Sequence, residues 1–356
     1  MSRSGRRERA EGGRRAGDLF IVGLPGKELD GETEALLQEV GPGGVILFSR
    51  NVESAEQLGA LVAAIRRAAP GALLYCDAEG GRVDRLAGIV GPAPAGAALA
   101  RGAPELARRA GRWVGESLRL FGFDVDFAPV VDLDHGEEAN ALDGRYLGRR
   151  PAKVVPRARA FLEGLHQAGV GGCVKHFPGL GPSRGDTHFE TGLVEGEADE
   201  LAPDLEPFAR LADLAGAVMV AHAVFPGLDP ERRPASLSRS IASLLLRGRL
   251  GFSGVAVADD LEMLALEPWG GLAERSEAAL VAGCDLLPVC HTLEAVPEVL
   301  DRLERPELAG RIAEARERLA AYRRALREHS PAEPPDLATV RERLAEVAVE
   351  AQAASA

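Results

Sequence analysis

The chain has 356 residues, of which 46% are hydrophobic and 27% are charged, so it can bury a large core as two ordinary domains or one large barrel. This composition excludes a disordered chain, and the net charge of −12 argues against a nucleic-acid-binding surface. No run approaches about 18 apolar residues, so no membrane insertion is expected.

Four cysteines stand singly in apolar runs, without the spacing of a zinc site: Cys76, Cys173, Cys284 and Cys290. This pattern predicts buried, reduced thiols. Residues 1–17 are rich in arginine but contain no apolar segment, which is unlike a secretory signal. We predict a flexible, solvated tail over 1–17, with contact to anionic surfaces as the alternative, and a cytoplasmic location.

From residue 18 onward, short apolar strands alternate with amphipathic helices. Strands are predicted at 18–24, 43–48, 73–77, 124–133, 170–177, 217–224, 254–260 and 284–290. About eight strands alternating with helices favour an α/β fold, a closed (β/α)8 TIM-type barrel, over an open doubly wound sheet. No G-x-G-x-x-G follows the first strand, which weakens a dinucleotide-binding interpretation. We predict one barrel domain over 18–328 and a C-terminal helical extension over 329–356.

Polar side chains end five consecutive predicted strands. They are Asp77, Asp132, Lys175 with His176, His222, and Asp259 with Asp260. Because catalytic groups of a parallel barrel lie at the carboxyl ends of its strands, this predicts one polar pocket at one mouth of the barrel. Neighbouring side chains of an extended strand point to opposite faces, so only one of Asp259 and Asp260 is expected to face the pocket.

The segment DAEGGRVDRL (77–86) places Asp77 at a strand end, followed by two glycines and two arginines. Asp77 could accept hydrogen bonds from two vicinal sugar hydroxyls, with Arg85 as a second ligand contact. The alternative is a structural Asp–Arg pair at the rim. Arg82 is expected to be structural, and Arg145, taken alone, looks like an ordinary exposed arginine.

The segment GGCVKHFPGLGPSRGDTHFE (171–190) begins as a buried strand and then breaks at several Gly and Pro residues. Lys175 could form a Schiff base, donate hydrogen bonds to a substrate, or pair with neighbouring Asp residues. The spacing of Asp186 and His188 lets the carboxylate hold one imidazole nitrogen and leave the other for proton transfer. A solvated loop histidine is the alternative, and we expect the segment with these two residues to move when no ligand is bound.

Two further interpretations concern the histidines and the paired acids. His176, His188 and His222 could bind a metal, but there is no H-x-H or H-x-x-x-H pair, so no metal site is predicted. Asp259 could act as a nucleophile toward an electrophilic carbon, whereas the alternative for Asp259 or Asp260 is to cap the following helix.

Five segments in this order resemble glycoside hydrolase family 3: DAEGGRVDRL, DFAPVVDL, KHFPGLG with GDTH, AHAVFPGLDP and GVAVADDLEM. They cover the chain from about Asp18 to Cys290. Within the family the chain resembles the single-domain bacterial β-N-acetylhexosaminidases of peptidoglycan recycling.

The resemblance implies Asp259 as nucleophile and His188 as general acid/base, oriented by Asp186. Residues matching those that hold the N-acetylglucosamine ring are Asp77, Arg85, Arg145, Lys175 and His176. The implied activity is that of a retaining exo-β-N-acetylglucosaminidase that acts on GlcNAc-1,6-anhydroMurNAc and its peptides. No cofactor is implied, the partner is a small carbohydrate or muropeptide, and we expect a monomer.

Related activities remain open: a β-glucosidase, a glycoside phosphorylase, or a non-catalytic sugar-binding barrel. Three departures from the family pattern bear on substrate preference and rate. Leu180 replaces a histidine, Ala258 replaces a serine or threonine, and the lead-in to Arg145 is unusual.

Overall fold

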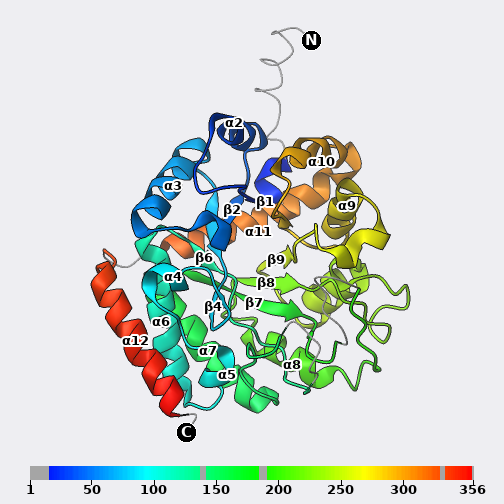
Figure 1. The fold of residues 1–356 in the computed structure, drawn as a ribbon. Helices are drawn as coiled ribbons and strands as arrows, with labels where there is room; N and C mark the ends of the chain where they lie inside the picture. The colour runs from blue at the N-terminus through cyan, green and yellow to red at the C-terminus, as the bar shows by residue number, and fades with distance from the viewer. Residues whose placement is uncertain (1–15, 137–141, 184–190, 329–332, 355–356) are drawn as a thin grey trace.

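A computed structural model of the chain describes residues 16–136, 142–183, 191–328 and 333–354 (Figure 1). Eight parallel strands form one sheet in the order β10-β1-β2-β3-β6-β7-β8-β9. They are β1 (Phe20–Gly23), β2 (Gly44–Leu47), β3 (Leu73–Cys76), β6 (Val125–Asp126), β7 (Gly171–Phe177), β8 (Ala217–Val220), β9 (Val255–Ala258) and β10 (Leu287–Val289). A bridge between Val257 and Leu286 joins β9 to the β10 side, so the sheet closes into the predicted barrel.

Helices surround the barrel (Figure 1). The α-helices are α2 (Gly31–Val40), α3 (Ala55–Ala68), α4 (Ala87–Val90), α5 (Gly96–Leu99), α6 (Pro104–Leu120), α7 (Pro151–Gln167), α8 (Ala202–Leu211), α9 (Leu272–Ala282), α10 (Val296–Leu303), α11 (Ala309–Glu328) and α12 (Leu337–Ala353). After β8, the connection includes η4 (Ser240–Arg249), a π-helix. A small hairpin, β4 (Ala78–Gly80) and β5 (Val83–Asp84), follows β3.

Local sequence signals explain several of these boundaries. Ser54 caps α3 by accepting a hydrogen bond from the Gln57 backbone N–H at 3.1 Å. The strand predicted over 124–133 is shorter than expected, because β6 ends at Asp126. Pro129 has no N–H to donate to a ladder, and beyond it only Val130 forms an isolated bridge, to Lys175.

Helices α6 and α7 approach each other closely through glycines. A Cβ atom on Gly111 would lie 2.1 Å from the Phe161 carbonyl oxygen, and one on Gly164 would lie 2.2 Å from that of Arg108. Side chains at these two positions would therefore force the helices apart. On the outside of this pair, α12 packs against α6 and buries Val340. Figure 1 shows α12 on the flank of the molecule beside α6.

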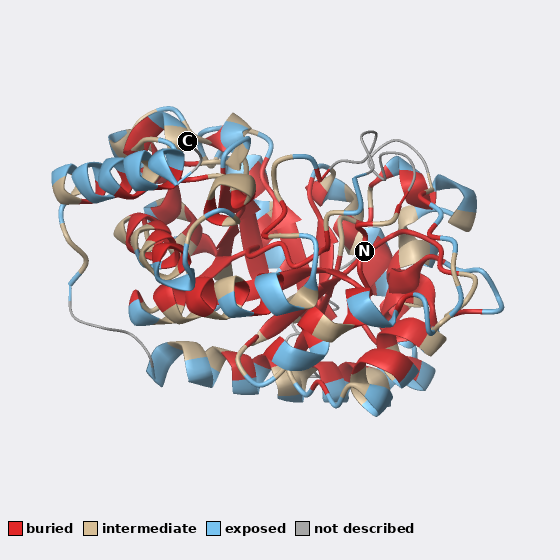
Figure 2. Cartoon of the chain, turned by 90° about the horizontal axis from the view of Figure 1, so that it is seen from below, coloured by how far each residue is buried: buried red, intermediate tan, exposed pale blue. Residues whose placement is uncertain are grey.

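Helix α11 closes the end of the barrel where the strands begin. Figure 2 shows it lying across that end, with one face buried and the other exposed. Leu319 and Tyr322 pack into the cluster that fills the barrel interior, which also contains Ile21, Tyr75 and Val257. The barrel interior is therefore a packed core that α11 covers at this end.

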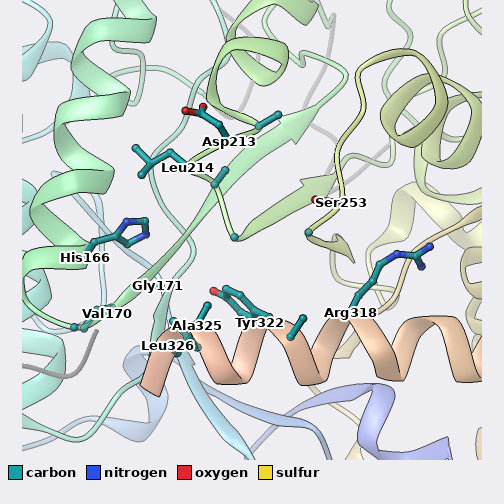
Figure 3. A pocket seen from close by; sticks show the side chains of 16 residues that line it. His166, Val170, Gly171, Asp213, Leu214, Ser253, Arg318, Tyr322, Ala325 and Leu326 are labelled. Atoms are coloured by element: carbon teal, nitrogen blue, oxygen red, sulfur yellow. The ribbon is translucent and has the colours of Figure 1, made fainter. Parts of the chain in front are cut away.

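A cavity of about 430 Å³ lies at this end of the barrel, between α7, α11 and the residues that lead into β7, β8 and β9 (Figure 3). Its polar lining includes His166, Asp213, Arg318 and Tyr322. The Tyr322 hydroxyl is buried and has no hydrogen-bond partner within the described parts of the chain.

Two expectations from composition can be compared with the structure. All four cysteines are buried and free, as predicted. Over the ranges given above, no helix combines the length and apolar character needed to cross a membrane.

Candidate active site

At the carboxyl end of the strands, a cavity of about 400 Å³ opens to the surface. All five predicted sugar-binding residues and the predicted nucleophile line it: Asp77, Arg85, Arg145, Lys175, His176 and Asp259. The lining also includes Phe48, Glu79, Arg82, Asp260 and His291. Strand ends that are far apart in the sequence thus meet at one mouth, as the polar strand-end pattern predicts.

Glu79 is the centre of the charged wall, and sequence reasoning missed it. Its carboxylate accepts hydrogen bonds from Arg145 Nε at 2.7 Å and Nη2 at 2.8 Å. Lys175 Nζ lies 2.6 Å from the same carboxylate. Burial opposes ionisation of Glu79, but Lys175 and Arg145 outweigh it and hold the pKa of the carboxyl well below its usual range. Arg145 is therefore a fixed wall residue rather than an ordinary exposed arginine.

Lys175 connects Glu79 to Asp77. Its Nζ atom donates to Asp77 Oδ1 at 3.0 Å, and Arg85 Nη2 donates to Asp77 Oδ2 at 3.3 Å. Burial lowers the pKa of Lys175, but Glu79 and Asp77 raise it more, so that it ends above its ordinary value. Because a Schiff base requires a neutral amine, this geometry favours the donor and ion-pair roles of Lys175 over the Schiff-base alternative.

Asp132 holds His176 from behind the pocket wall. Its carboxylate lies 2.8 Å from His176 Nδ1 and also accepts the backbone N–H groups of His176 and Leu180. The hydrogen on Nδ1 is therefore directed at the carboxylate, and Nε2 faces the pocket, 3.5 Å from Arg145 Nη2. Asp132 is fully buried, so it positions a wall residue rather than meeting a ligand.

Asp259 and Asp260 both line the pocket, so the expectation that only one of them faces it is wrong. Strand β9 ends at Ala258, and the alternation of side chains does not extend past the strand. The backbone N–H of Asp259 donates to Val220 O at 3.0 Å, which ties this residue to β8. Asp259 Oδ1 accepts the Asp260 backbone N–H at 2.9 Å.

His222 does not line the pocket, contrary to the strand-end pattern. Its Nδ1 atom lies 2.7 Å from Ser236 Oγ, and its Nε2 lies 2.8 Å from the Asp260 carbonyl oxygen. Burial lowers the pKa of His222, which favours the neutral ring. The histidine thus supports the backbone of the Asp260 turn from below.

The predicted proton-transfer pair, Asp186 and His188, lies outside the described residues, as does the predicted motion of their segment. Among the residues that the structure does describe, no three His, Cys, Asp or Glu side chains gather as a metal site would require. Arg82, expected to be structural, is exposed at the mouth.

Comparison with known proteins places this barrel and its pocket in a family. Residues 15–321 match the model of the glycosyl hydrolase family 3 N-terminal domain. A β-hexosaminidase of Tolumonas auensis is 39% identical over 294 residues, which cover 81% of this chain and 87% of that protein. A β-hexosaminidase of Xanthomonas campestris pv. campestris is 41% identical over 292 residues, or 79% and 87% of the two chains.

Two solved structures share the fold. A family 3 β-N-acetylglucosaminidase from Paenibacillus sp. is 32% identical, with a TM-score of 0.85, and the match covers 94% of this chain and 68% of that one. NagZ from Neisseria gonorrhoeae, solved with N-trifluoroacetyl-D-glucosamine, is 33% identical with a TM-score of 0.72, covering 88% and 96%. From the family model and these relatives together, we conclude that the chain belongs to glycoside hydrolase family 3 and is a glycoside hydrolase.

Proposed function

We propose that this glycoside hydrolase is a retaining exo-β-N-acetylglucosaminidase. The observation that carries the proposal is one pocket that combines a carboxylate at a strand end, Asp259, with the charged wall of Asp77, Glu79, Arg145 and Lys175. The relatives named β-hexosaminidase support the choice of sugar. The cavity, at about 400 Å³, is of a size that takes small ligands.

The charged wall suits a terminal sugar ring. An ammonium has three N–H donors, and two of those on Lys175 are directed at Asp77 and Glu79, so one remains for a ring hydroxyl. Asp77 and Arg85 supply an acceptor and a donor next to it. Since this wall is the buried end of the pocket, it would receive the non-reducing end of a chain, which is the geometry of an exo-acting enzyme.

In the proposed reaction, Asp259 attacks the anomeric carbon and forms a covalent glycosyl ester while the bond to the leaving oxygen breaks. His188, oriented by Asp186, gives its proton to that oxygen. The neutral imidazole then takes a proton from water, which attacks the same carbon and releases the sugar and Asp259. A His–Asp pair replaces the usual second carboxylate, and a neutral imidazole does not repel the anionic Asp259.

The proposed substrates are GlcNAc-1,6-anhydroMurNAc and its peptides, hydrolysed without a cofactor by a cytoplasmic monomer. The proposed division of the chain is a tail over 1–17, a catalytic barrel over 18–328 and a helical extension over 329–356. Comparing activity on the anhydro-muropeptide with activity on chitobiose tests the substrate directly. Faster hydrolysis of chitobiose would contradict the muropeptide assignment.

The nucleophile is tested by Asp259→Ala with p-nitrophenyl N-acetyl-β-glucosaminide. We expect hydrolysis to be lost, whereas Asp213→Ala, the same change in a residue of the opposite cavity, should retain it. An Asp259→Ala enzyme working at the wild-type rate rules out the mechanism. Parallel assays with a β-glucoside and with added phosphate separate the glucosidase and phosphorylase alternatives.

The acid role of His188 is tested by varying the leaving group. His188→Ala should lose much more activity on the natural substrate than on a p-nitrophenyl glycoside, because p-nitrophenolate leaves without being protonated. Equal losses on the two substrates would argue against His188 as the general acid.

A further inference from the structure

His291, which follows β10, has no role in the mechanism above, yet it stands on the pocket wall. Its ring stacks on Phe48 with centroids 6.1 Å apart and an interplanar angle of 16°. Its Nε2 atom lies 3.5 Å from Asp260 Oδ2, and its backbone N–H donates to Glu262 Oε2 at 2.6 Å. Both its backbone and its ring are thus held in place although the side chain is 61% exposed.

The exposed fractions of the lining side chains distinguish the inner end of the pocket from its mouth. The side chains of Lys175 and Asp77 are 4% and 12% exposed, against 61% for His291. If a terminal sugar occupies the inner wall, as the proposed function requires, then the leaving group extends toward the mouth. His291 is therefore placed beside the leaving group rather than beside the sugar that is released.

The charged groups around His291 favour the protonated form of its ring. Asp260, Glu262 and Arg50 are the charged groups that act on the ring, and the side-chain contact with Asp260 raises the pKa of His291. Once protonated, the ring has two N–H donors. Nε2 faces Asp260, while Nδ1 has no partner in the described part of the chain.

Arg50 adds a second positive charge near the His291 ring, because both side chains contact Phe48. Its guanidinium lies 4.5 Å from the Phe48 ring centroid and donates to the carbonyl oxygens of Leu24 and Cys290. No carboxylate pairs with it among the described residues. The mouth therefore presents a free imidazole N–H with a nearby cation whose charge is not neutralised by direct contact.

We propose that His291 determines specificity by donating a hydrogen bond from Nδ1 to a carboxylate on the leaving group of the substrate. This inference rests on the proposed function, because it requires the sugar to occupy the inner wall. With this contact, the enzyme would prefer those N-acetylglucosaminides that have an acidic leaving group.

The test compares two aryl glycosides, 4-nitrophenyl and 3-carboxy-4-nitrophenyl N-acetyl-β-glucosaminide. The quantity compared is kcat/KM for the carboxylated glycoside divided by kcat/KM for the plain glycoside. Effects common to both substrates cancel in this ratio, including the titration of Asp259 and His188. At pH 6 we expect this ratio to be about two- to fivefold higher for the wild type than for His291→Asn, the range of an exposed ion pair. His291→Gln provides a second neutral side chain in case the shorter amide disturbs the turn.

Three controls make the result specific. In the wild type, the ratio should decline as the pH rises from 6 to 8.5, because the imidazolium of His291 loses its proton. The ratio should also decline with added salt, which screens the charges. Asp260→Asn removes the main cause of the raised pKa and should move this decline to lower pH, which a purely structural role would not do. His166→Asn, the same substitution in the opposite cavity, should leave the ratio at the wild-type value.

If both glycosides are cleaved and the ratio is the same in the wild type and both His291 variants, the inference is wrong while the proposed function stands. If the wild type cleaves neither glycoside, the proposed function fails and the inference fails with it.

Discussion

Replacing Glu79 by glutamine tests whether the charged wall holds the pocket together. The side chain keeps its size but loses the charge that faces Lys175 at 2.6 Å and Arg145 at 2.7 Å. Glu79 and Lys175 are each 4% exposed, so solvent screens these contacts little. Breaking a buried pair by removing one partner costs about 3–5 kcal/mol, because the remaining charges stay buried.

Urea unfolding of Glu79→Gln should therefore show the free energy of unfolding lowered by about 3–5 kcal/mol, out of a total of about 5–15 kcal/mol. We also expect kcat/KM to fall by about 100-fold, because Arg145 and Lys175 lose the group that fixes their positions. Glu105→Gln is the matched control: Glu105 pairs with Arg108 at 3.0 Å but is 67% exposed. Its cost should stay below about 1 kcal/mol.

The pH dependence adds an independent check. The folded-state pKa of Glu79 is depressed, so its stabilisation is present above the unfolded value of 4.5 and is lost as pH falls toward the folded value. The difference in stability between wild type and Glu79→Gln should accordingly narrow below pH 4.5. A Glu79→Gln variant within about 1 kcal/mol of the wild type at pH 7 would refute the reasoning.

Three further outcomes are expected. Borohydride, which reduces a Schiff base to a stable adduct, should leave the mass of the protein unchanged when it is added with substrate. The raised pKa keeps Lys175 protonated, so the lysine does not form a Schiff base. A stable adduct on Lys175 would contradict this expectation. Because burial lowers the pKa of His222 below 6.5, the unfolded chain binds a proton on this histidine at a higher pH than the folded chain does. The free energy of unfolding should therefore fall as the pH drops below 6.5, and it should fall less in His222→Asn. Equal pH slopes in urea unfolding of the two proteins would refute this expectation. Tyr322→Phe should change the free energy of unfolding by less than about 1 kcal/mol, because the Tyr322 hydroxyl has no hydrogen-bond partner among the described residues. Tyr322→Ala should lower it by about 3–5 kcal/mol, because it removes the buried ring. A large loss in Tyr322→Phe would contradict the first expectation.

The barrel could be predicted because its signals are local. Each strand is a short apolar run, and the alternation with helices fixes a parallel sheet. The strand predicted over 124–133 shows the limit of such signals, since pairing stops at Asp126 although the apolar residues continue. Whether an apolar segment joins a ladder depends on its partners, which the segment alone does not reveal.

The site was predictable where a residue stands at a strand end and its side chain turns inward. Asp77, Lys175 and His176 follow this rule and line the pocket. His222 also ends a strand, but it hydrogen-bonds behind the wall, because inward and outward positions depend on where each strand stops. The role of Glu79 could not be predicted by this rule, because the residue lies in a hairpin beyond the strand and its partner Arg145 is 66 residues away.

The closure of the barrel has a consequence for its synthesis. Strand β1 pairs with β10, joining Phe20 to Leu287, and α11 fills the barrel floor with Leu319 and Tyr322. At about 5–20 residues per second, the roughly 270 residues from Phe20 to Leu287 take about 13–54 s to emerge from a ribosome. During that time β1 has no partner on one side and is an open sheet edge, the kind that pairs with other chains. A nascent chain halted before β10 should therefore depend on chaperones, whereas in the finished chain β10 covers that edge of β1.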